Sequence, residues 1–331
     1  MRALIVGLGS IGRRHLENLR SLEPMAQVTV LRHSETQEQS NEIPGDEVRV
    51  VHSIDEALKL RPDIAILANP ASMHMASGLA LAQAGVSLLV EKPLAHTLEG
   101  VEELINVCQQ RHLVLMVGYN LRFYQPLQVM WRVLQEGRIG RLVSLRAEVG
   151  QFLPDWRPGR DYRKTVSAKR ELGGGALFEL SHELDYVRWL AGEVNTVSAC
   201  VGQLSDLEID VEDTVELILQ FRSGGLGSVH LNMVQHPMSR RCHLIGTEGT
   251  LTWDGVSHQV RWFSTATQRW SELHPTASLD RNEMYVAELR HFLECVRAHE
   301  VPAVDGEEGR RTLELILAAK RSAEERRAID L

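Results

Sequence analysis

Through the first 118 residues, short apolar runs alternate with segments whose apolar residues recur at every third or fourth position. Continuous apolar runs are typical of strands covered on both faces, and the longer spacing is typical of helices with one buried face. The pattern predicts strands at 3–6, 27–31, 48–51, 63–68, 87–90 and 113–117, and helices at 10–22, 54–60, 72–84 and 97–111. Repeated strand–helix units predict a doubly wound parallel sheet, which we assign to a domain of residues 1–120.

The pattern changes after residue 120. Apolar and polar residues alternate in several later segments, and glycine-containing turns separate them, which is typical of antiparallel strands. The predicted strands are 142–149, 212–222, 226–234, 241–246 and 250–253; the predicted helices are 125–136, one that opens at the glycines 173–175 and runs to about 190, 281–299 and 307–326; and 152–170 is a polar loop. Residues 121–331 are therefore predicted to form an α+β domain on a large, mostly antiparallel sheet.

The first strand ends in the glycine pattern Gly7-x-Gly9-x-x-Gly12, and a helix follows. In a strand–turn–helix, Gly7 permits a tight turn, Gly9 lets a pyrophosphate approach the backbone, and Gly12 lets helix and strand pack closely. Ser10 and Ile11 lie at the helix N-terminus, whose free N–H groups attract phosphate. The context predicts a dinucleotide-binding turn, and the alternative is a glycine-rich turn that binds no ligand.

The second predicted strand indicates which dinucleotide this is. An NAD site usually has an acidic residue there, whereas an arginine suits the 2′-phosphate of NADP. Arg32 follows that strand, twenty positions after Gly12, and His33 adds a further donor. We predict NADP, with NAD as the alternative if Arg32 is only solvated.

The carboxyl ends of parallel strands meet at one edge of the sheet, where ligands bind. Besides the glycine turn and Arg32, the predicted strand ends carry Asn69-Pro70, Glu91-Lys92 and Asn120. A lysine at this edge can hydrogen-bond a substrate hydroxyl or stabilise a developing alkoxide. Lys92 is therefore a candidate catalytic residue, and the alternative is a surface lysine paired with Glu91.

The predicted helix after the glycine triplet holds a second candidate. His182 and Asp185 are three residues apart and share a helix face, and Glu179 precedes His182 by three. An acid beside an imidazole raises its basicity, which suits a general base that takes a hydroxyl proton. The alternative is a histidine that packs between domains, and the spacing does not decide whether Glu179 or Asp185 is its partner.

The loop at 152–170 is the most cationic segment of the chain. Trp156 and Tyr162 are suited to stack on a sugar or a nicotinamide, and Arg157 and Arg160 to bind a carboxylate or phosphate. The loop is predicted to bind substrate, and the alternative is a charged surface at an oligomer contact.

Composition narrows the class of protein. The 331 residues are 44% hydrophobic and 24% charged with a net charge of −8, which is typical of a globular protein and argues against nucleic acid as the main partner. No apolar run approaches the length that spans a bilayer, and the four cysteines are widely spaced. We expect a cytoplasmic protein with reduced thiols, no membrane partner and no metal site.

In order, these segments resemble the Gfo/Idh/MocA family, which includes glucose–fructose oxidoreductase and inositol dehydrogenase. The resemblance covers essentially the whole chain, and its carriers are Gly7–Gly12 with His15, the segment from Ala68 to His74, Glu91-Lys92-Pro93, 118–123, 173–185 and 304–309. It implies a Rossmann domain, catalytic roles for Lys92 and His182, a nicotinamide near Asn120, and His74 as a further cofactor-site residue. It also implies a homodimer or homotetramer. Many relatives have an aspartate four residues before the histidine, where this chain has Phe178.

The residues and the resemblance together predict an NAD(P)-dependent oxidoreductase that acts on a CH–OH group of a sugar, sugar acid or nucleotide-sugar. Lys92 would polarise the reacting oxygen, and His182 would exchange its proton. Two alternatives stay open: glycoside cleavage or elimination with no net redox change, and a non-catalytic sensor that binds the cofactor.

Overall fold

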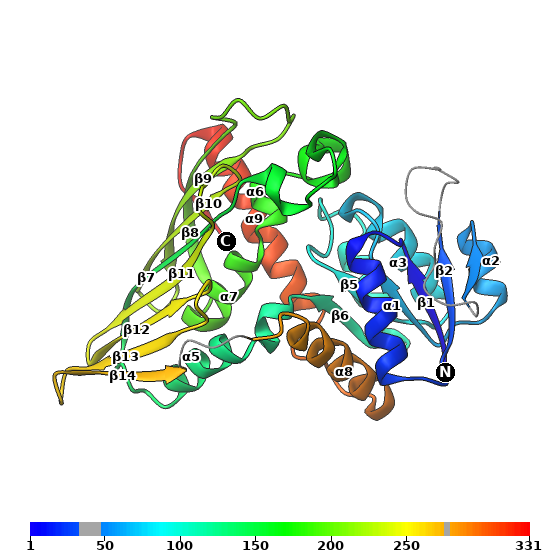
Figure 1. Cartoon of the computed structure of the whole chain (residues 1–331), viewed down its shortest axis with the longest axis horizontal. Helices are drawn as coiled ribbons and strands as arrows, with labels where there is room; N and C mark the ends of the chain where they lie inside the picture. The colour runs from blue at the N-terminus through cyan, green and yellow to red at the C-terminus, as the bar shows by residue number, and fades with distance from the viewer. Residues whose placement is uncertain (33–47, 275–278) are drawn as a thin grey trace. The chain divides into compact units, whose positions relative to one another are not determined.

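The computed structural model describes residues 1–32, 48–274 and 279–331 (Figure 1). These residues divide into two compact units, one of Met1–Asn120 with Asn282–Leu313, the other of Leu121–Arg281 with Glu314–Leu331. The first unit therefore includes a segment, Asn282–Leu313, that the sequence placed in the second domain. Tertiary contacts explain the difference: the N–H of Val117 donates to the carbonyl of Val304 over 2.9 Å, and helix α8 (Glu283–Ala298) packs on α1 (Ser10–Leu22).

A parallel sheet forms the centre of the first unit. Its strand order is β3-β2-β1-β4-β5-β6, the order of a Rossmann fold. The strands are β1 (Arg2–Val6), β2 (Gln27–Leu31), β3 (Arg49–Val51), β4 (Ile64–Leu67), β5 (Ser87–Glu91) and β6 (Leu115–Gly118), and every pair between neighbours is parallel. The apolar runs confirm their prediction, because nearly every side chain of β1, β4, β5 and β6 is buried.

The helices of the first unit pack in two groups. Helix α1 lies with α8, while α3 (His74–Gln83) contacts both α2 (Ile54–Lys59) and α4 (Val101–Gln110). A short 3₁₀ turn, η1 (Ala71–Met73), leads into α3. Helix α9 (Gly306–Glu325) begins in this unit and ends in the other.

The second unit is built on a nine-stranded sheet with the order β14-β13-β12-β11-β7-β10-β9-β8-β15, as far as the described residues define it. The strands are β7 (Leu142–Gly150), β8 (Val194–Gly202), β9 (Thr214–Phe221), β10 (Leu226–Asn232), β11 (Ser239–Gly246), β12 (Gly249–Asp254), β13 (Val260–Ser264), β14 (Arg269–His274) and β15 (Ile329–Asp330). The predicted hairpins β9–β10 and β11–β12 are confirmed. One central pair, β10 with β7, is parallel, so the sheet is mostly antiparallel.

One face of this sheet is covered by α5 (Gln125–Gln135), α6 (Ala176–Glu179) and α7 (His182–Ala191). The polar loop contains four 3₁₀ turns, η3 (Leu153–Trp156), η4 (Tyr162–Lys164), η5 (Val166–Ala168) and η6 (Arg170–Leu172), and η2 (Asn120–Phe123) precedes α5. The single helix predicted up to residue 190 is wrong. The backbone of Leu180 leaves the helical region at φ −100° and ψ 22°, so α6 ends there and α7 begins at His182.

No helix in the described ranges is both long enough and apolar enough to cross a membrane.

Candidate active site

The glycine turn between β1 and α1 has the geometry that each glycine was predicted to supply. Gly7 has a φ of +91°, which favours glycine, and a Cβ there would lie 2.9 Å from the carbonyl oxygen of Ala68. A Cβ on Gly12 would lie 2.1 Å from the carbonyl oxygen of Gly7, so only glycine allows this approach of helix to strand. A Cβ on Gly9, by contrast, would meet nothing within 4 Å. The turn thus leaves open backbone where a pyrophosphate would bind.

Helix α1 adds the electrostatics that a phosphate needs. Its N-cap is Gly9, which has no side chain to cap the first N–H groups, and its first turn carries no acidic residue. The thirteen-residue helix therefore presents free N–H donors and the positive end of its dipole at the turn, where Ser10 and Ile11 lie.

The remaining predicted cofactor residues of this unit follow parallel strands and so lie at the same edge of the sheet. Arg32 follows β2, Asn69 and Pro70 follow β4, Lys92 follows β5 and Asn120 follows β6. The backbone N–H of Arg32 donates to Val51 over 3.0 Å, which fixes the start of its side chain beside β3. His33 lies outside the described residues.

His74 has a structural role that the sequence did not show. Its side chain is buried, Nε2 lies 2.9 Å from the Asn69 carbonyl oxygen, and Nδ1 lies 3.1 Å and 3.2 Å from those of Pro93 and Leu94. Burial lowers the pKa of this imidazole. The ring thus joins the chain after β4 to the chain after β5, and a direct contact with the cofactor stays a prediction.

The backbone at Lys92 is supported by the side chain of the preceding residue. The N–H of Lys92 donates to the Glu91 carboxylate over 3.2 Å, and the peptide bond from Lys92 to Pro93 is cis. Glu91 is itself buried and hydrogen-bonds to His15, so it contributes to the support of Lys92. The Glu91 carboxylate thereby fixes the backbone from which the Lys92 side chain extends.

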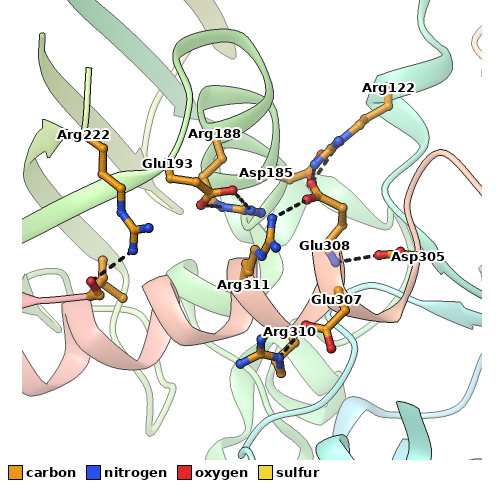
Figure 2. Close-up of polar contacts among 11 residues, drawn as sticks. Arg122, Asp185, Arg188, Glu193, Arg222, Asp305, Glu307, Glu308, Arg310 and Arg311 are labelled. Atoms are coloured by element: carbon orange, nitrogen blue, oxygen red, sulfur yellow. Dashed lines mark hydrogen bonds and ion pairs between the residues drawn. The ribbon is translucent and has the colours of Figure 1, made fainter. Parts of the chain in front are cut away.

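His182 is the first residue of α7, and this helix is anchored by buried ion pairs. The carboxylate of Asp185 accepts three hydrogen bonds from the Arg122 guanidinium, at 2.7 Å, 3.0 Å and 3.2 Å, with the two side chains 0% and 7% exposed (Figure 2). Near the other end, Arg188 pairs with Glu193 at 2.7 Å. Glu183, also fully buried, pairs with Arg240 of β11 at 2.7 Å. Asp185 thus holds the helix to Arg122, and a role in orienting His182 stays a prediction.

Glu179 does not share a helix face with His182, because α6 ends at Glu179 and α7 starts three residues later. Its carboxylate accepts a hydrogen bond of 2.6 Å from the Ser167 hydroxyl. The two residues therefore lie on separate helices, since the backbone at Leu180 interrupts the predicted one, and a contact between Glu179 and His182 stays a prediction.

The four predicted substrate residues lie around one pocket of the second unit. Trp156, Arg157, Arg160 and Tyr162 line a small hollow with a cavity volume of about 10 Å³, together with Leu153, Pro154, Thr165 and Ser167. The indole N–H of Trp156 donates to the Gln151 carbonyl over 3.1 Å, and the Tyr162 hydroxyl accepts from the N–H of Glu208 over 3.2 Å. These bonds fix the loop, and through Ser167 the pocket also reaches Glu179.

Two residues that contribute to the structure of these sites were not identified from the sequence. Arg122 was part of a motif but had no role until its contact with Asp185 was seen. Glu288 is fully buried on α8, four residues after the buried Met284 and four before the buried Phe292. A glutamate at the apolar positions of a helix is the signal that could have identified it.

The parallel sheet and its open glycine turn define a Rossmann unit with the geometry of a dinucleotide-binding site. The chain belongs to the Gfo/Idh/MocA oxidoreductase family: residues 1–119 match its NAD-binding Rossmann fold and residues 132–331 match its C-terminal alpha/beta domain. The predicted family, fold class and enzyme class are confirmed.

Similar proteins are sugar and nucleotide-sugar dehydrogenases. Myo-inositol 2-dehydrogenase of Thermotoga maritima is 28% identical over 100% of this chain and 98% of its own, and UDP-N-acetylglucosamine 3-dehydrogenase of Acidithiobacillus ferrooxidans is 25% identical over 98% and 97%. The WlbA dehydrogenase of Bordetella pertussis, solved with NADH and UDP-GlcNAcA, has a TM-score of 0.84 and is 27% identical, over 100% of this chain and 98% of its own.

Proposed function

We propose that this protein transfers a hydride between a nicotinamide cofactor and a hydroxyl- or ketone-bearing carbon of a sugar acid or nucleotide-sugar. The observation that carries the proposal is the glycine turn, open at Gly9, on the same strand edge as Lys92. When bound, the dinucleotide supplies or accepts the hydride. The α1 N-terminus binds its pyrophosphate.

Two side chains of the protein handle the proton and the charge on the substrate oxygen. Lys92 donates a hydrogen bond to this oxygen and stabilises negative charge that develops on it. His182 takes the hydroxyl proton during oxidation and returns it during reduction. The pair Arg122–Asp185 keeps the helix that carries His182 in place. Glu179 or Asp185 is the acid that orients the imidazole.

The loop pocket favours a substrate that carries a negative charge. Of the neighbouring basic residues, Arg163 is paired with Asp161 and Glu208, and Arg170 hydrogen-bonds Asp210. Among the described residues, no carboxylate pairs with the pocket residues Arg157 and Arg160. Two guanidinium groups are therefore available for a carboxylate or phosphate, which they bind in a bidentate manner. The similar WlbA dehydrogenase, solved with UDP-GlcNAcA, supports this substrate class.

The test of the function is a screen of purified protein with NAD, NADH, NADP and NADPH against neutral sugars, sugar acids and nucleotide-sugars. Cofactor fluorescence should change in step with product formation, and anionic substrates should give the highest kcat/KM. Steady product formation without any change in the cofactor would replace the proposal by redox-neutral cleavage or elimination. Cofactor binding without product from any compound would favour a sensor.

Cofactor choice gives a separate prediction. We propose that NADP is preferred because Arg32 follows β2, where an acid would select NAD. Arg32→Ala should weaken NADPH binding by about tenfold to a hundredfold, the value of about 1.5–3 kcal/mol for a charged hydrogen bond, and leave NADH binding nearly unchanged. Fluorescence titrations with both cofactors measure the ratio. Arg49→Ala, on the neighbouring strand β3, is the matched control. An unchanged NADPH/NADH ratio in Arg32→Ala would remove the argument for NADP.

We further propose that the active protein is a homodimer or homotetramer. The sheet face opposite the helices of the second unit carries exposed apolar side chains on three strands, Ile218, Leu226 and Ile245. Exposed apolar groups on an open sheet support an association of copies through this face.

A further inference from the structure

Three titratable side chains from distant parts of the sequence meet inside the first unit, apart from the residues given chemical roles above. They are His15 on α1, Glu91 at the end of β5 and Glu288 on α8. One ligand atom of each lies within 4.8 Å of those of the other two. The exposed fractions of the residues are 0%, 9% and 0%, so water does not screen their charges.

Within this cluster, Glu91 accepts hydrogen bonds on both oxygens. Oε1 lies 2.7 Å from Nε2 of His15, and Oε2 accepts from the backbone N–H of Lys92 over 3.2 Å. One carboxylate therefore connects the phosphate-binding helix α1 with the backbone of Lys92. Both contacts are strongest when Glu91 is ionised, because charged acceptors form the shorter and stronger hydrogen bonds.

The carboxyl group of Glu288, unlike that of Glu91, lacks hydrogen bonds of this kind within the described part of the chain. Neither of its carboxyl oxygens has a hydrogen-bond partner among the described residues, although both are buried. The titratable groups that face it are Glu91 and His15; of the arginines near this helix, Arg14 stacks on the Tyr285 ring and Arg297 pairs with Glu23. Ionising both of two close, buried carboxyl groups costs free energy, because the two negative charges repel each other. Burial, together with the charge of Glu91, raises the pKa of Glu288 well above its usual value.

The distance between His15 and Glu91 favours a hydrogen bond over a shared metal ion. Two ligands of one tetrahedral zinc ion, each at about 2.0 Å from it, lie about 3.3 Å apart. The His15–Glu91 distance of 2.7 Å is shorter than this and matches a charge-assisted hydrogen bond.

We propose that Glu288 is a positioning residue that stays protonated at neutral pH, so that Glu91 alone is ionised and holds both α1 and the backbone of Lys92. The arrangement gives the two carboxyl groups one negative charge instead of two. Ionisation of Glu288 would add a second charge next to Glu91 and weaken the support of Lys92. The consequence for catalysis rests on the proposed role of Lys92, whereas the protonation of Glu288 does not.

The test compares the stability of the wild type and Glu288→Gln across pH, without substrate. A glutamate in the unfolded chain loses its proton near about pH 4.3. Above that pH the folded wild type holds one more proton than the unfolded chain, so its stability falls as pH rises until Glu288 itself ionises. Glutamine has no such titration. The ratio of the unfolding constant of the wild type to that of Glu288→Gln should therefore rise about tenfold per pH unit between about pH 5 and the pH at which folded Glu288 ionises.

Three companion measurements make the result specific. Glu294→Gln, the same change at an exposed position of α8, should show no such rise. In a Glu91→Gln background the rise should level off at a lower pH, because the like charge is gone. At high pH, kcat of the wild type should fall relative to that of Glu288→Gln, since only the wild type gains the second charge.

A ratio that does not change with pH would overturn the proposal. A stoichiometric metal ion in the wild type that is lost in Glu288→Gln would overturn it as well, because the cluster would then be a metal site. If Glu288→Gln does not fold, the infrared spectrum of the wild type at pH 7 decides: the carbonyl band of a buried protonated glutamic acid supports the proposal, and its absence refutes it. Equal kcat profiles of two folded proteins would contradict only the link to Lys92.

Discussion

Lys92→Ala should lower kcat by about 10²- to 10⁴-fold, the range observed when a positioned acid–base group or an oxyanion donor is removed. The cofactor should still bind with nearly unchanged affinity, because the glycine turn and the free N–H groups of α1 do not depend on this side chain. Stopped-flow measurement of hydride transfer and fluorescence titration of the cofactor separate the two effects. The backbone support from Glu91 remains in the variant, so its fold should be unaffected.

The matched control for this variant is Lys59→Ala. Lys59 is exposed in the last turn of α2 and does not follow a strand of the parallel sheet. Its removal should leave both kcat and cofactor affinity unchanged. A loss of cofactor affinity as large as the loss of kcat in Lys92→Ala would count against a role in the chemical step. It would indicate that the lysine only binds the dinucleotide.

Asp185→Ala should lower the free energy of unfolding by about 3–5 kcal/mol, because it removes the carboxylate that accepts three hydrogen bonds from the buried Arg122 guanidinium. The pair is 7% and 0% exposed and makes three hydrogen bonds, so little solvent screening reduces its strength. Denaturant titration measures the loss. Because α7 carries His182 at its first residue, kcat should fall too.

Two comparisons test the explanation for Asp185. The double variant Arg122→Met with Asp185→Leu removes both charges of the pair, so it should be more stable than Asp185→Ala. Arg321→Ala, which breaks the exposed pair Arg321–Glu325 on α9, should cost less than about 1 kcal/mol. An Asp185→Ala variant that loses no more stability than Arg321→Ala would show that the buried pair does not hold α7.

The Rossmann unit could be predicted closely because local signals and tertiary structure agree there. Wholly apolar runs are buried in parallel strands, and Gly7 and Gly12 have steric roles that follow from backbone geometry alone. The residues after each strand could be assigned to one edge because parallel strands leave only one edge for their carboxyl ends. What this did not reveal is that His74 lies within hydrogen-bond distance of the Asn69 carbonyl and that Glu91 accepts a hydrogen bond from the backbone of Lys92.

The second unit was harder to predict because its structure depends on contacts between distant residues. The hairpins β9–β10 and β11–β12 follow from short turns. The parallel pairing of β10 with β7 and the place of β15 beside β8 join segments that are far apart in the sequence, so a local pattern does not predict them. The break at Leu180 is similar, since residues 176–190 have no proline or glycine to mark it. Likewise, only the tertiary structure shows that Arg122 makes three hydrogen bonds to Asp185.

The division of the chain between its two units has a practical consequence for dissecting the protein. A gene fragment that stops at residue 120 would encode every strand of the parallel sheet yet omit α8 and, with it, the layer that covers α1. Such a fragment would leave apolar side chains of α1 uncovered and invite aggregation during expression. A minimal nucleotide-binding module would instead need a designed linker that joins residue 120 to residues 282–313 and replaces the 161 residues between them.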